Sequence, residues 1–485
     1  MTGADGELWR LTATQMVAAV RSGDVSVSDV VDAHLERIEA VNDEVRAVVL
    51  VLDEQARRHA RQADRDIATG KRPGPLHGVP FTVKENIDLA GSPTTQGVPA
   101  MADAVPRADA PHVARLRGAG AIPLARTNCP DLGIGWHTIS TLYGPTFNPW
   151  DPEVTPGGSS GGEAAAIATG MSPLGVGGDL SGSLRWPAAC CGIVALKPTL
   201  GRIPRAPMQE PGDLPLSLQL MLAEGPLART VDDVRLALAV MAGEDWRDPW
   251  TSPVPLEGPP ATGPVRVALV PDPAPGGTER EIEGGVRAAG AALADRGYVV
   301  EEREPPGIER AAEIWLDILT SDMSTAMETM TPPWGNEQAT FVERLFALAQ
   351  TTTPARTLAA YVARLQLQRA WGEFLDGDRV IVAPVCATLP FAARDSLSDV
   401  PGTFANMSIT TACNALGLPA IALPVGLAAG LPVGLQVIAG RFREDLCLTV
   451  AGALESHFAS LTPIDPRARR AREDGGDDPP HARGA

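Results

Sequence analysis

Lysine is almost missing from this chain of 485 residues. Only Lys71, Lys84 and Lys197 occur among 41 basic residues, and the rest are arginine. Acidic residues outnumber basic ones, with 59 against 41, so the formal net charge is −18 at pH 7. This balance argues against direct binding to nucleic acid, because proteins that bind phosphate backbones carry basic patches. Each lysine therefore calls for a specific explanation.

Cysteine and histidine are also scarce. The six cysteines contain no C-x-x-C pair, which favours buried free thiols in a reducing cytoplasm over disulfides. None of the seven histidines pairs with another at i, i+4, the spacing that places two ligands on one helix face. We therefore expect no metal site and no cofactor.

Long hydrophobic runs are absent as well. No apolar stretch reaches the roughly 18 residues of a spanning helix, and the first residues lack the basic and apolar regions of a signal peptide. A hydrophobic content of 44% is ordinary for a globular protein. These features predict a cytoplasmic protein without membrane contact.

Glycine and serine are concentrated between Thr155 and Pro198. Two loops, 157–162 and 177–183, expose backbone N–H groups that suit a phosphate or an oxyanion. A phosphate-binding loop is disfavoured because neither the P-loop lysine nor G-x-G-x-x-G spacing is present. A Ser-His-Asp hydrolase would carry a G-x-S-x-G elbow, which is missing. The remaining interpretation is a hydrolase with a serine nucleophile and a base other than histidine.

Lys84 is the candidate base. Val79, Phe81 and Val83 alternate with polar or small residues, so residues 79–83 are expected to form a strand with Lys84 near its end. Burial can lower the pKa of a lysine enough for it to accept a proton. A surface lysine in an ion pair is the plainer interpretation, but the strand-end position and the two serine loops favour catalysis.

Short apolar strands alternate with helices along the chain, which indicates an α/β fold with a mostly parallel sheet. We expect a single domain over residues 1–465, in which a large mixed, mostly parallel central sheet is covered by helices on both faces. Residues 155–198 would hold the catalytic motif and 300–375 a divergent helical segment beside the substrate. Residues 466–485 read as a mobile tail.

Three motifs carry a resemblance to a known family. They read G-V-P-F-T-V-K-E-N-I-D, P-G-G-S-S-G-G-E and G-G-D-L-S-G-S-L-R-W-P-A-A-C-C-G-I-V-A-L-K-P-T. With these motifs the chain resembles the amidase signature family, serine amidohydrolases that use a Ser–cis-Ser–Lys triad. The resemblance covers most of residues 8–456, and the 24 residues from Ser159 to Ser183 match the family spacing.

The resemblance implies a role for each matched residue. Lys84 would be the general base, Ser159 the bridging serine after a cis peptide bond, and Ser183 the nucleophile. Ser160 would orient Lys84 through a hydrogen bond. Asp179 and Arg185 would brace the loop. The oxyanion hole would be formed by the N–H groups of Leu180, Ser181, Gly182 and Ser183.

Two positions depart from the family pattern. The family often has Thr or Ser at position 178 and Gly at position 181, where this chain has Gly178 and Ser181. The Ser181 side chain is expected to narrow the pocket or to adjust the loop.

Aromatic residues are the candidates for the substrate wall. Gly133, Ile134 and Trp136 occupy the segment that lines the acyl channel in fatty acid amide hydrolase, and for Trp136 core packing is equally well supported. Core packing is expected for four residues of the divergent segment, Trp315, Trp334, Phe341 and Phe346.

The sequence therefore predicts an amidase that cleaves a carboxamide to a carboxylic acid and ammonia or an amine through a serine acyl-enzyme. Its partner would be a small-molecule amide, and a homodimer is allowed. One alternative is the glutaminase subunit of a tRNA-dependent amidotransferase, which shares the triad. Another is an inactive binding protein on the same fold, which the presence of all three triad residues disfavours.

Overall fold

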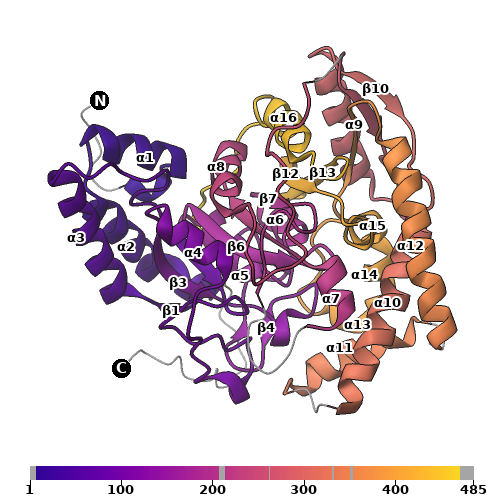
Figure 1. The fold of residues 1–485 in the computed structure, drawn as a ribbon, viewed down its shortest axis with the longest axis horizontal. Helices are drawn as coiled ribbons and strands as arrows, with labels where there is room; N and C mark the ends of the chain where they lie inside the picture. The colour runs from indigo at the N-terminus through magenta and orange to yellow at the C-terminus, as the bar shows by residue number, and fades with distance from the viewer. Residues whose placement is uncertain (1–6, 207–213, 261–262, 330–332, 350–352, 470–485) are drawn as a thin grey trace.

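The computed structural model describes residues 7–206, 214–260, 263–329, 333–349 and 353–469. These residues are built around a sheet of 11 strands in the order β1-β3-β2-β6-β8-β7-β12-β13-β11-β9-β10 (Figure 1). Of the tail predicted at 466–485, residues 470–485 lie outside the described residues. The strands are β1 (Val48–Val51), β2 (Pro80–Lys84), β3 (Ile122–Thr127), β6 (Leu174–Asp179), β7 (Val194–Lys197), β8 (Ala223–Ala228), β9 (Arg266–Leu269), β10 (Val299–Glu302), β11 (Arg379–Pro384), β12 (Ala420–Ala428) and β13 (Leu431–Ile438), with β4 (Ile139–Ser140) and β5 (Gly144–Pro145) in a separate pair.

The sheet is mixed, as expected, although only four of its ten strand pairings are parallel. Parallel pairing occurs in two groups of three strands, β3-β2-β6 and β11-β9-β10. The strands between these groups pair antiparallel, and so does β1 at one edge. The middle of the sheet is antiparallel partly because β12 and β13 are joined by a two-residue turn, a connection that only antiparallel neighbours allow.

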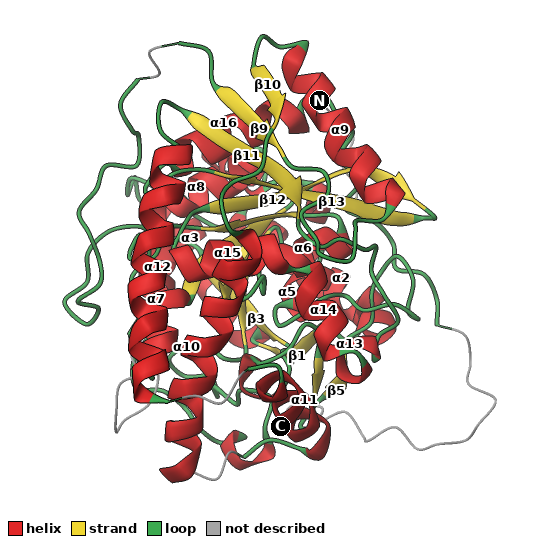
Figure 2. Cartoon of the chain, turned by 90° about the vertical axis from the view of Figure 1, so that its right-hand side faces the viewer, coloured by secondary structure: helices red, strands yellow, loops and turns green. Residues whose placement is uncertain are grey.

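Helices cover both faces of the central strands (Figures 1 and 2). The short helices α5 (Gly161–Ala168) and α6 (Arg185–Cys191) pack on one face, and α8 (Val231–Met241) and α16 (Glu444–Glu455) on the other. α5 and α6 are buried on all sides. The outer helices at the N-terminal side and next to β9 and β10 are α1 (Ala13–Ser22), α2 (Val27–Val45), α3 (Asp53–Ala68), α4 (Pro111–Gly118) and α9 (Arg280–Ala294).

A layer of helices stands against the sheet on the side that faces the viewer in Figure 2. Its long members α10 and α12 run side by side, and α10 also packs on α15 and α7. The helical character expected for residues 300–375 is confirmed over α10, α11 and α12, whereas residues 300–302 belong to β10 and residues 330–332 and 350–352 lie outside the described residues. The helices of this layer are α7 (Leu216–Met221), α10 (Ile308–Thr329), α11 (Asn336–Ala347), α12 (Pro354–Phe374), α13 (Asp395–Ser398), α14 (Val400–Asn406) and α15 (Ser408–Leu416).

Local sequence explains where several helices begin. Thr12 and Gln15 form a capping box at the start of α1, and Thr230 caps α8 by accepting a hydrogen bond from the Asp233 N–H. Strand β8 was not expected from the sequence, because Pro226 lies inside it and proline usually marks a strand edge or a turn. Here Pro226 pairs with Val176 in the middle of the sheet.

A buried ion pair ties the end of β6 to the start of α6. Arg185 donates to the Asp179 carboxylate from Nε and Nη2, each at 3.0 Å, and both side chains are fully buried. Arg185 also donates to Gln436 on β13 at 2.8 Å and to Asn414 on α15 at 2.6 Å. One guanidinium therefore joins the strand, the helical layer and the far part of the sheet.

Asp179 is held in its charged form. Burial alone would raise its pKa, but the charge and hydrogen bonds of Arg185 outweigh burial and keep the pKa of Asp179 well below its usual 3.8. The stabilisation is therefore present above about pH 4 and is lost as the pH falls through the lower, folded-state pKa.

Replacing Asp179 with Asn should lower the free energy of unfolding by about 3–5 kcal/mol, because the amide leaves the buried Arg185 charge without a counter-ion. Urea denaturation at pH 7 measures this loss. The control is Glu283→Gln, which breaks a half-exposed ion pair with Arg287 and should cost less than about 0.5 kcal/mol. Equal losses in the two variants would contradict the role given to the Asp179–Arg185 pair.

Candidate active site

The candidate site lies where two parallel strands end. Strand β2 pairs with β6 so that Val83 lies opposite Val176, and Lys84 is the last residue of β2. The loop after β6 carries residues 180–183, and Ser159 lies just before α5, which packs on both strands. Since the carboxyl ends of parallel neighbours meet at the same edge of a sheet, segments far apart in sequence converge there.

Within the described part of the chain, Lys84 makes a single side-chain hydrogen bond, from Nζ to Ser159 Oγ at 2.7 Å. Its side chain is buried, and no carboxylate lies within ion-pair distance of it among the described residues. Burial lowers the pKa of Lys84 below the usual 10.5, against the opposing influence of the more distant Glu224 and Glu163. A lysine in this environment can be neutral and can accept a proton from Ser159.

The loop before α5 is tightly packed against residue 137. The peptide bond between Gly158 and Ser159 is cis, as the resemblance implies. A Cβ at Gly158 would lie only 2.0 Å from the backbone oxygen of His137, so only glycine fits there. The next residue, Ser160, donates its N–H to the Ser183 carbonyl at 3.3 Å. The backbones that carry Ser159 and Ser183 are therefore neighbours.

Ser183 keeps contact with open space. It is 8% exposed, and its Oγ makes no hydrogen bond to another described residue. The Oγ is also not fully enclosed by protein. A hydroxyl in this position can meet a substrate carbonyl.

The expected orienting role of the Ser160 hydroxyl is wrong. Its Oγ is buried without a hydrogen-bond partner, whereas Lys84 Nζ bonds to Ser159. The Ser160 side chain turns instead toward β6, where a Cβ on Gly177 would lie 2.8 Å from its Oγ. Ser160 contributes through its backbone N–H, which donates to Ser183.

One of the four expected oxyanion donors is already occupied. The N–H of Gly182 donates to Asp179 Oδ1 at 2.8 Å, so this group is a poor candidate for a substrate oxygen. The same carboxylate accepts the N–H of Leu184 at 3.1 Å. The N–H groups of Leu180, Ser181 and Ser183 have no protein acceptor in the described part of the chain. These three remain as candidates.

The Ser181 side chain does not project freely into the site. Its Oγ lies 2.8 Å from the hydroxyl of Thr411 on α15, so the extra side chain attaches the loop to the helical layer. Gly178 is the second position that differs from the family pattern. A Cβ there would lie 2.8 Å from Glu224 Oε2, so glycine leaves room for the Glu224 carboxylate. Glu224 pairs with Gly178 across β6 and β8 and accepts a hydrogen bond from Arg205 at 3.2 Å.

Aromatic side chains gather beside residues 180–181. Phe404, which is half-buried, lies between the indoles of Trp136 and Trp315 with ring centroids 6.4 and 6.0 Å away, and Phe341 meets Trp136 edge-on at 5.5 Å. We call these four residues the aromatic cluster. Trp136, Trp315 and Phe341 are buried, which confirms core packing for Trp315 and Phe341.

The remaining aromatic and pocket candidates are only partly buried. Trp334 and Phe346 are half-buried, so core packing holds for them only in part. Ile134 is half-buried, and its carbonyl accepts a hydrogen bond from Gln338 of α11 at 2.6 Å. Gly133 has a φ of +69° and lies against Asn86, where a Cβ would be 2.4 Å from Nδ2.

Sequence reasoning overlooked Glu163 in the first turn of α5. Its carboxylate is buried and accepts hydrogen bonds from the hydroxyls of Thr82 on β2, at 2.5 Å, and Thr127 on β3, at 2.7 Å. Burial raises the pKa of Glu163 to about 7. It fastens α5, and with it the Ser159 loop, to the strand that ends in Lys84. Its place in the motif P-G-G-S-S-G-G-E was the available signal.

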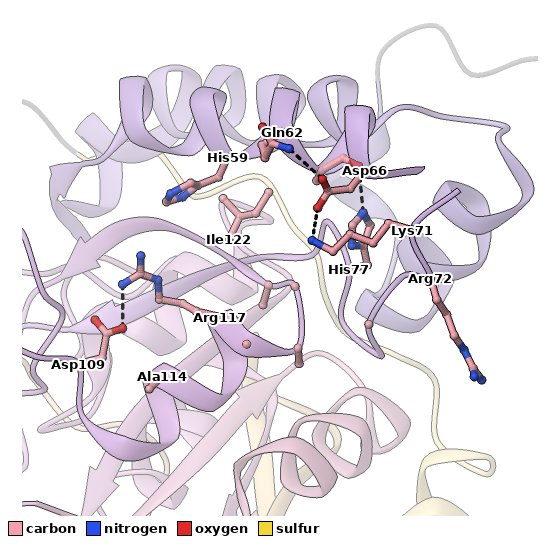
Figure 3. A pocket seen from close by; sticks show the side chains of 16 residues that line it. His59, Gln62, Asp66, Lys71, Arg72, His77, Asp109, Ala114, Arg117 and Ile122 are labelled. Carbon is pink, nitrogen blue, oxygen red and sulfur yellow. Dashed lines mark hydrogen bonds and ion pairs between the residues drawn. The ribbon is translucent and has the colours of Figure 1, made fainter. Parts of the chain in front are cut away.

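A cavity of about 700 Å³ lies elsewhere, between α3 and α4 (Figure 3). Ile122, which lines it, begins β3, so the cavity is at the amino ends of β2 and β3, opposite the end that carries Lys84. Two of its cations are paired, Lys71 with Asp66 at 2.6 Å and Arg117 with Asp109 at 2.7 Å. None of the candidate catalytic residues lines this cavity.

The described residues contain no group of three or more His, Cys, Asp or Glu side chains arranged to hold a metal ion. Within the same residues, every helix is too short or too polar to cross a membrane. All six cysteines are free and buried, as expected.

Curated relatives match nearly the whole chain. An indoleacetamide hydrolase of Bradyrhizobium diazoefficiens is 41% identical over 94% of this chain and 88% of its own length. An acylamidase of Rhodococcus erythropolis is 34% identical over 94% and 97%. A glutamyl-tRNA(Gln) amidotransferase subunit of Chloroflexus aurantiacus is 32% identical over 93% and 97%.

Solved structures agree with these relatives. A bacterial aryl acylamidase of the amidase signature family superposes with a TM-score of 0.80 and 25% identity, covering 94% of this chain and 96% of its own. The family model named Amidase matches residues 29–448. The chain therefore belongs to the amidase family and is a hydrolase that acts on carbon–nitrogen amide bonds.

Proposed function

We propose that this amidase hydrolyses a primary arylacetamide, of the type of indoleacetamide, to the arylacetate and ammonia through an acyl-enzyme on Ser183. The observation that carries the proposal is the 2.7 Å hydrogen bond from the buried Lys84 Nζ to Ser159 Oγ, beside the loop that presents Ser183. A lysine with a lowered pKa in contact with a serine is a competent general base.

The reaction follows from this arrangement. Neutral Lys84 takes the proton of Ser159, and Ser159 takes the proton of Ser183 as its Oγ attacks the amide carbonyl. Backbone N–H groups of the loop stabilise the oxyanion. When the carbon–nitrogen bond breaks, the proton returns through Ser159 to the nitrogen, which leaves as ammonia. Water then attacks the acyl carbonyl and gives a proton through Ser159 to Lys84. The ester bond to Ser183 breaks, the proton returns to Ser183 Oγ, and the arylacetate leaves.

The aromatic cluster supports an aryl group on the acyl side. Trp315 and Trp136 donate to the carbonyls of residues 180 and 181 and lie on the side of the loop away from its N–H groups, so Phe404 is the ring of the cluster proposed to meet the acyl group. Phe404 is only half-buried and can offer a face to a substrate ring. The 41% identity to an indoleacetamide hydrolase points to the same class of acyl group.

The glutaminase component of an amidotransferase is the second candidate, supported by the 32% identity to such proteins. The higher identity to the indoleacetamide hydrolase and the apolar cluster favour the arylacetamide. An inactive binding protein is disfavoured by the Lys84–Ser159 contact. A homodimer stays a prediction, which the mass of the protein in solution tests.

The substrate test measures ammonia release by the isolated chain from indoleacetamide, phenylacetamide, acetamide and glutamine. We expect hydrolysis of the two arylacetamides with kcat/KM at least about tenfold above acetamide, and none of glutamine, because only an aromatic ring can use the cluster. Ser183→Ala should lower kcat more than about 10³-fold and abolish labelling by a fluorophosphonate.

The matched control for that test is Ser172→Ala, a change just before the other end of β6, where the hydroxyl donates to the Leu174 carbonyl. It should leave activity within about twofold of wild type. Glutamine turnover without arylacetamide turnover would favour the amidotransferase component, and activity in Ser183→Ala would refute the assignment of the nucleophile.

The pH profile tests Lys84. Because its pKa is lowered and the neutral form is required, kcat/KM should fall as the pH drops through an apparent pKa below 10.5. Lys84→Arg should lose at least about 10³-fold, since arginine stays protonated at every accessible pH. Measuring kcat/KM in buffers from about pH 6 to 10 tests both effects.

Lys197 provides the control, because it is the other buried lysine and burial lowers its pKa to about 8. It donates to the carbonyl of Pro198, away from the proposed proton path. Lys197→Met should therefore keep the acidic limb of the profile. A limb that disappears in Lys197→Met and persists in Lys84→Arg would overturn the assignment of the base.

A further inference from the structure

Two indole N–H groups bond to the backbone of the loop that precedes Ser183. Trp315, on α10, donates from Nε1 to the Leu180 carbonyl at 2.9 Å. Trp136 donates from Nε1 to the Ser181 carbonyl at 3.0 Å. The two tryptophans approach from segments that lie far from the loop in sequence, and both side chains are at most 3% exposed. Neighbouring carbonyls of the loop therefore each have a rigid side-chain donor.

The carbonyls on either side are occupied as well. Asn414, on α15, donates from Nδ2 to the Asp179 carbonyl at 2.7 Å, and the N–H of Trp186 donates to the Gly182 carbonyl at 2.7 Å. All four peptide planes between residues 179 and 183 are thus held from their oxygen side.

Peptide geometry converts this into an orientation of the N–H groups. In a trans peptide the carbonyl of one residue and the N–H of the next lie in one plane and point in opposite directions. The bonds of this loop are trans, since the cis bonds of the described chain lie at 158–159 and 462–463. A donor on the Leu180 carbonyl therefore fixes the Ser181 N–H to point away from Trp315.

We propose that Trp315 and Trp136 are positioning residues, whose indole N–H groups hold the loop so that its free N–H groups point at the substrate oxygen. The inference rests on the proposed acyl transfer at Ser183. Trp315 orients the Ser181 N–H. Trp136 orients the peptide plane between Ser181 and Gly182 by donating to its carbonyl, and Asp179 holds the same plane by accepting its N–H. Neither tryptophan needs to touch the reacting atoms.

This role differs from that of a substrate wall. A wall residue changes KM and discriminates between acyl groups, because it contacts the part of the substrate that varies. A residue that orients an oxyanion donor changes kcat by the same factor for every amide, since every substrate develops the same oxyanion. The two roles can therefore be separated by kinetics with one large and one small substrate.

The test compares Trp315→Phe with Trp371→Phe. Trp371 is a matched control because it is also buried on the helical layer and its Nε1 donates to a backbone carbonyl, that of Pro306, at 2.8 Å. Each substitution removes one indole N–H and keeps an aromatic ring. Kinetics with phenylacetamide and acetamide, the rate of fluorophosphonate labelling of Ser183 and the melting temperature are measured for both variants.

Trp315→Phe should lower kcat about 10- to 100-fold for both substrates, with KM within about twofold, and slow the labelling in proportion. Trp371→Phe should leave kcat unchanged even where its melting temperature falls by the same amount. A change confined to KM, a loss of kcat with one substrate only, or an equal loss in Trp371→Phe would overturn the proposal.

Trp136→Phe is the second variant, and it keeps the proposal testable if Trp315→Phe does not fold. It should lower kcat for both substrates by a smaller factor, because Asp179 still holds the same peptide plane. Unchanged kcat in Trp136→Phe would count against the proposal. The activity of the wild type and the inactivity of Ser183→Ala address the proposed function alone, so failure of either idea can be recognised separately.

Discussion

The contact between Asp179 and Arg185 is the constraint on which the rest of the site depends. The pair is fully buried, so neither charge can be left without the other. Asp179 also accepts two N–H groups of the loop that it begins, at Gly182 and Leu184. Arg185 reaches Asn414 on α15. These contacts hold the turn between β6 and α6 through a carboxylate whose pKa lies well below its usual range in spite of burial, because this guanidinium stabilises its charge.

The loop places its polar groups in two directions. Its carbonyls face the protein, where donors from Asn414, Trp315, Trp136 and the backbone of Trp186 satisfy them. Most of its N–H groups face the other way and remain unpaired among the described residues. A buried backbone donor without a partner is costly, and a substrate oxygen that supplies the missing acceptor recovers that cost in the transition state. The loop is thus held in place through its carbonyls, and its unpaired N–H groups are available to a substrate oxygen.

Sequence reasoning predicted the parts of the site that depend on local pattern. The alternation before Lys84 indicated a strand end, which β2 confirms, and the glycine-rich motifs carried the family resemblance that assigns roles to Ser159 and Ser183. It failed for polar groups whose contacts depend on the folded loop: the Ser160 hydroxyl has no hydrogen-bond partner in the described structure, and the Gly182 N–H donates to Asp179. Trp315 lies 135 positions from Leu180, so no local pattern could reveal that it donates to that residue. Strand β8 was not predicted because it contains Pro226, and proline is unusual inside a sheet.

The most direct test of the proposed acyl transfer is a crystal structure of the fluorophosphonate adduct. We expect a covalent bond from Ser183 Oγ to phosphorus, with the phosphoryl oxygen accepting hydrogen bonds of about 2.7–3.1 Å from the backbone nitrogens of Ser181 and Ser183. The Gly182 N–H should stay bonded to Asp179, and Lys84 should stay bonded to Ser159. Phosphorus on any other residue, or a phosphoryl oxygen turned away from the loop, would contradict the proposed mechanism.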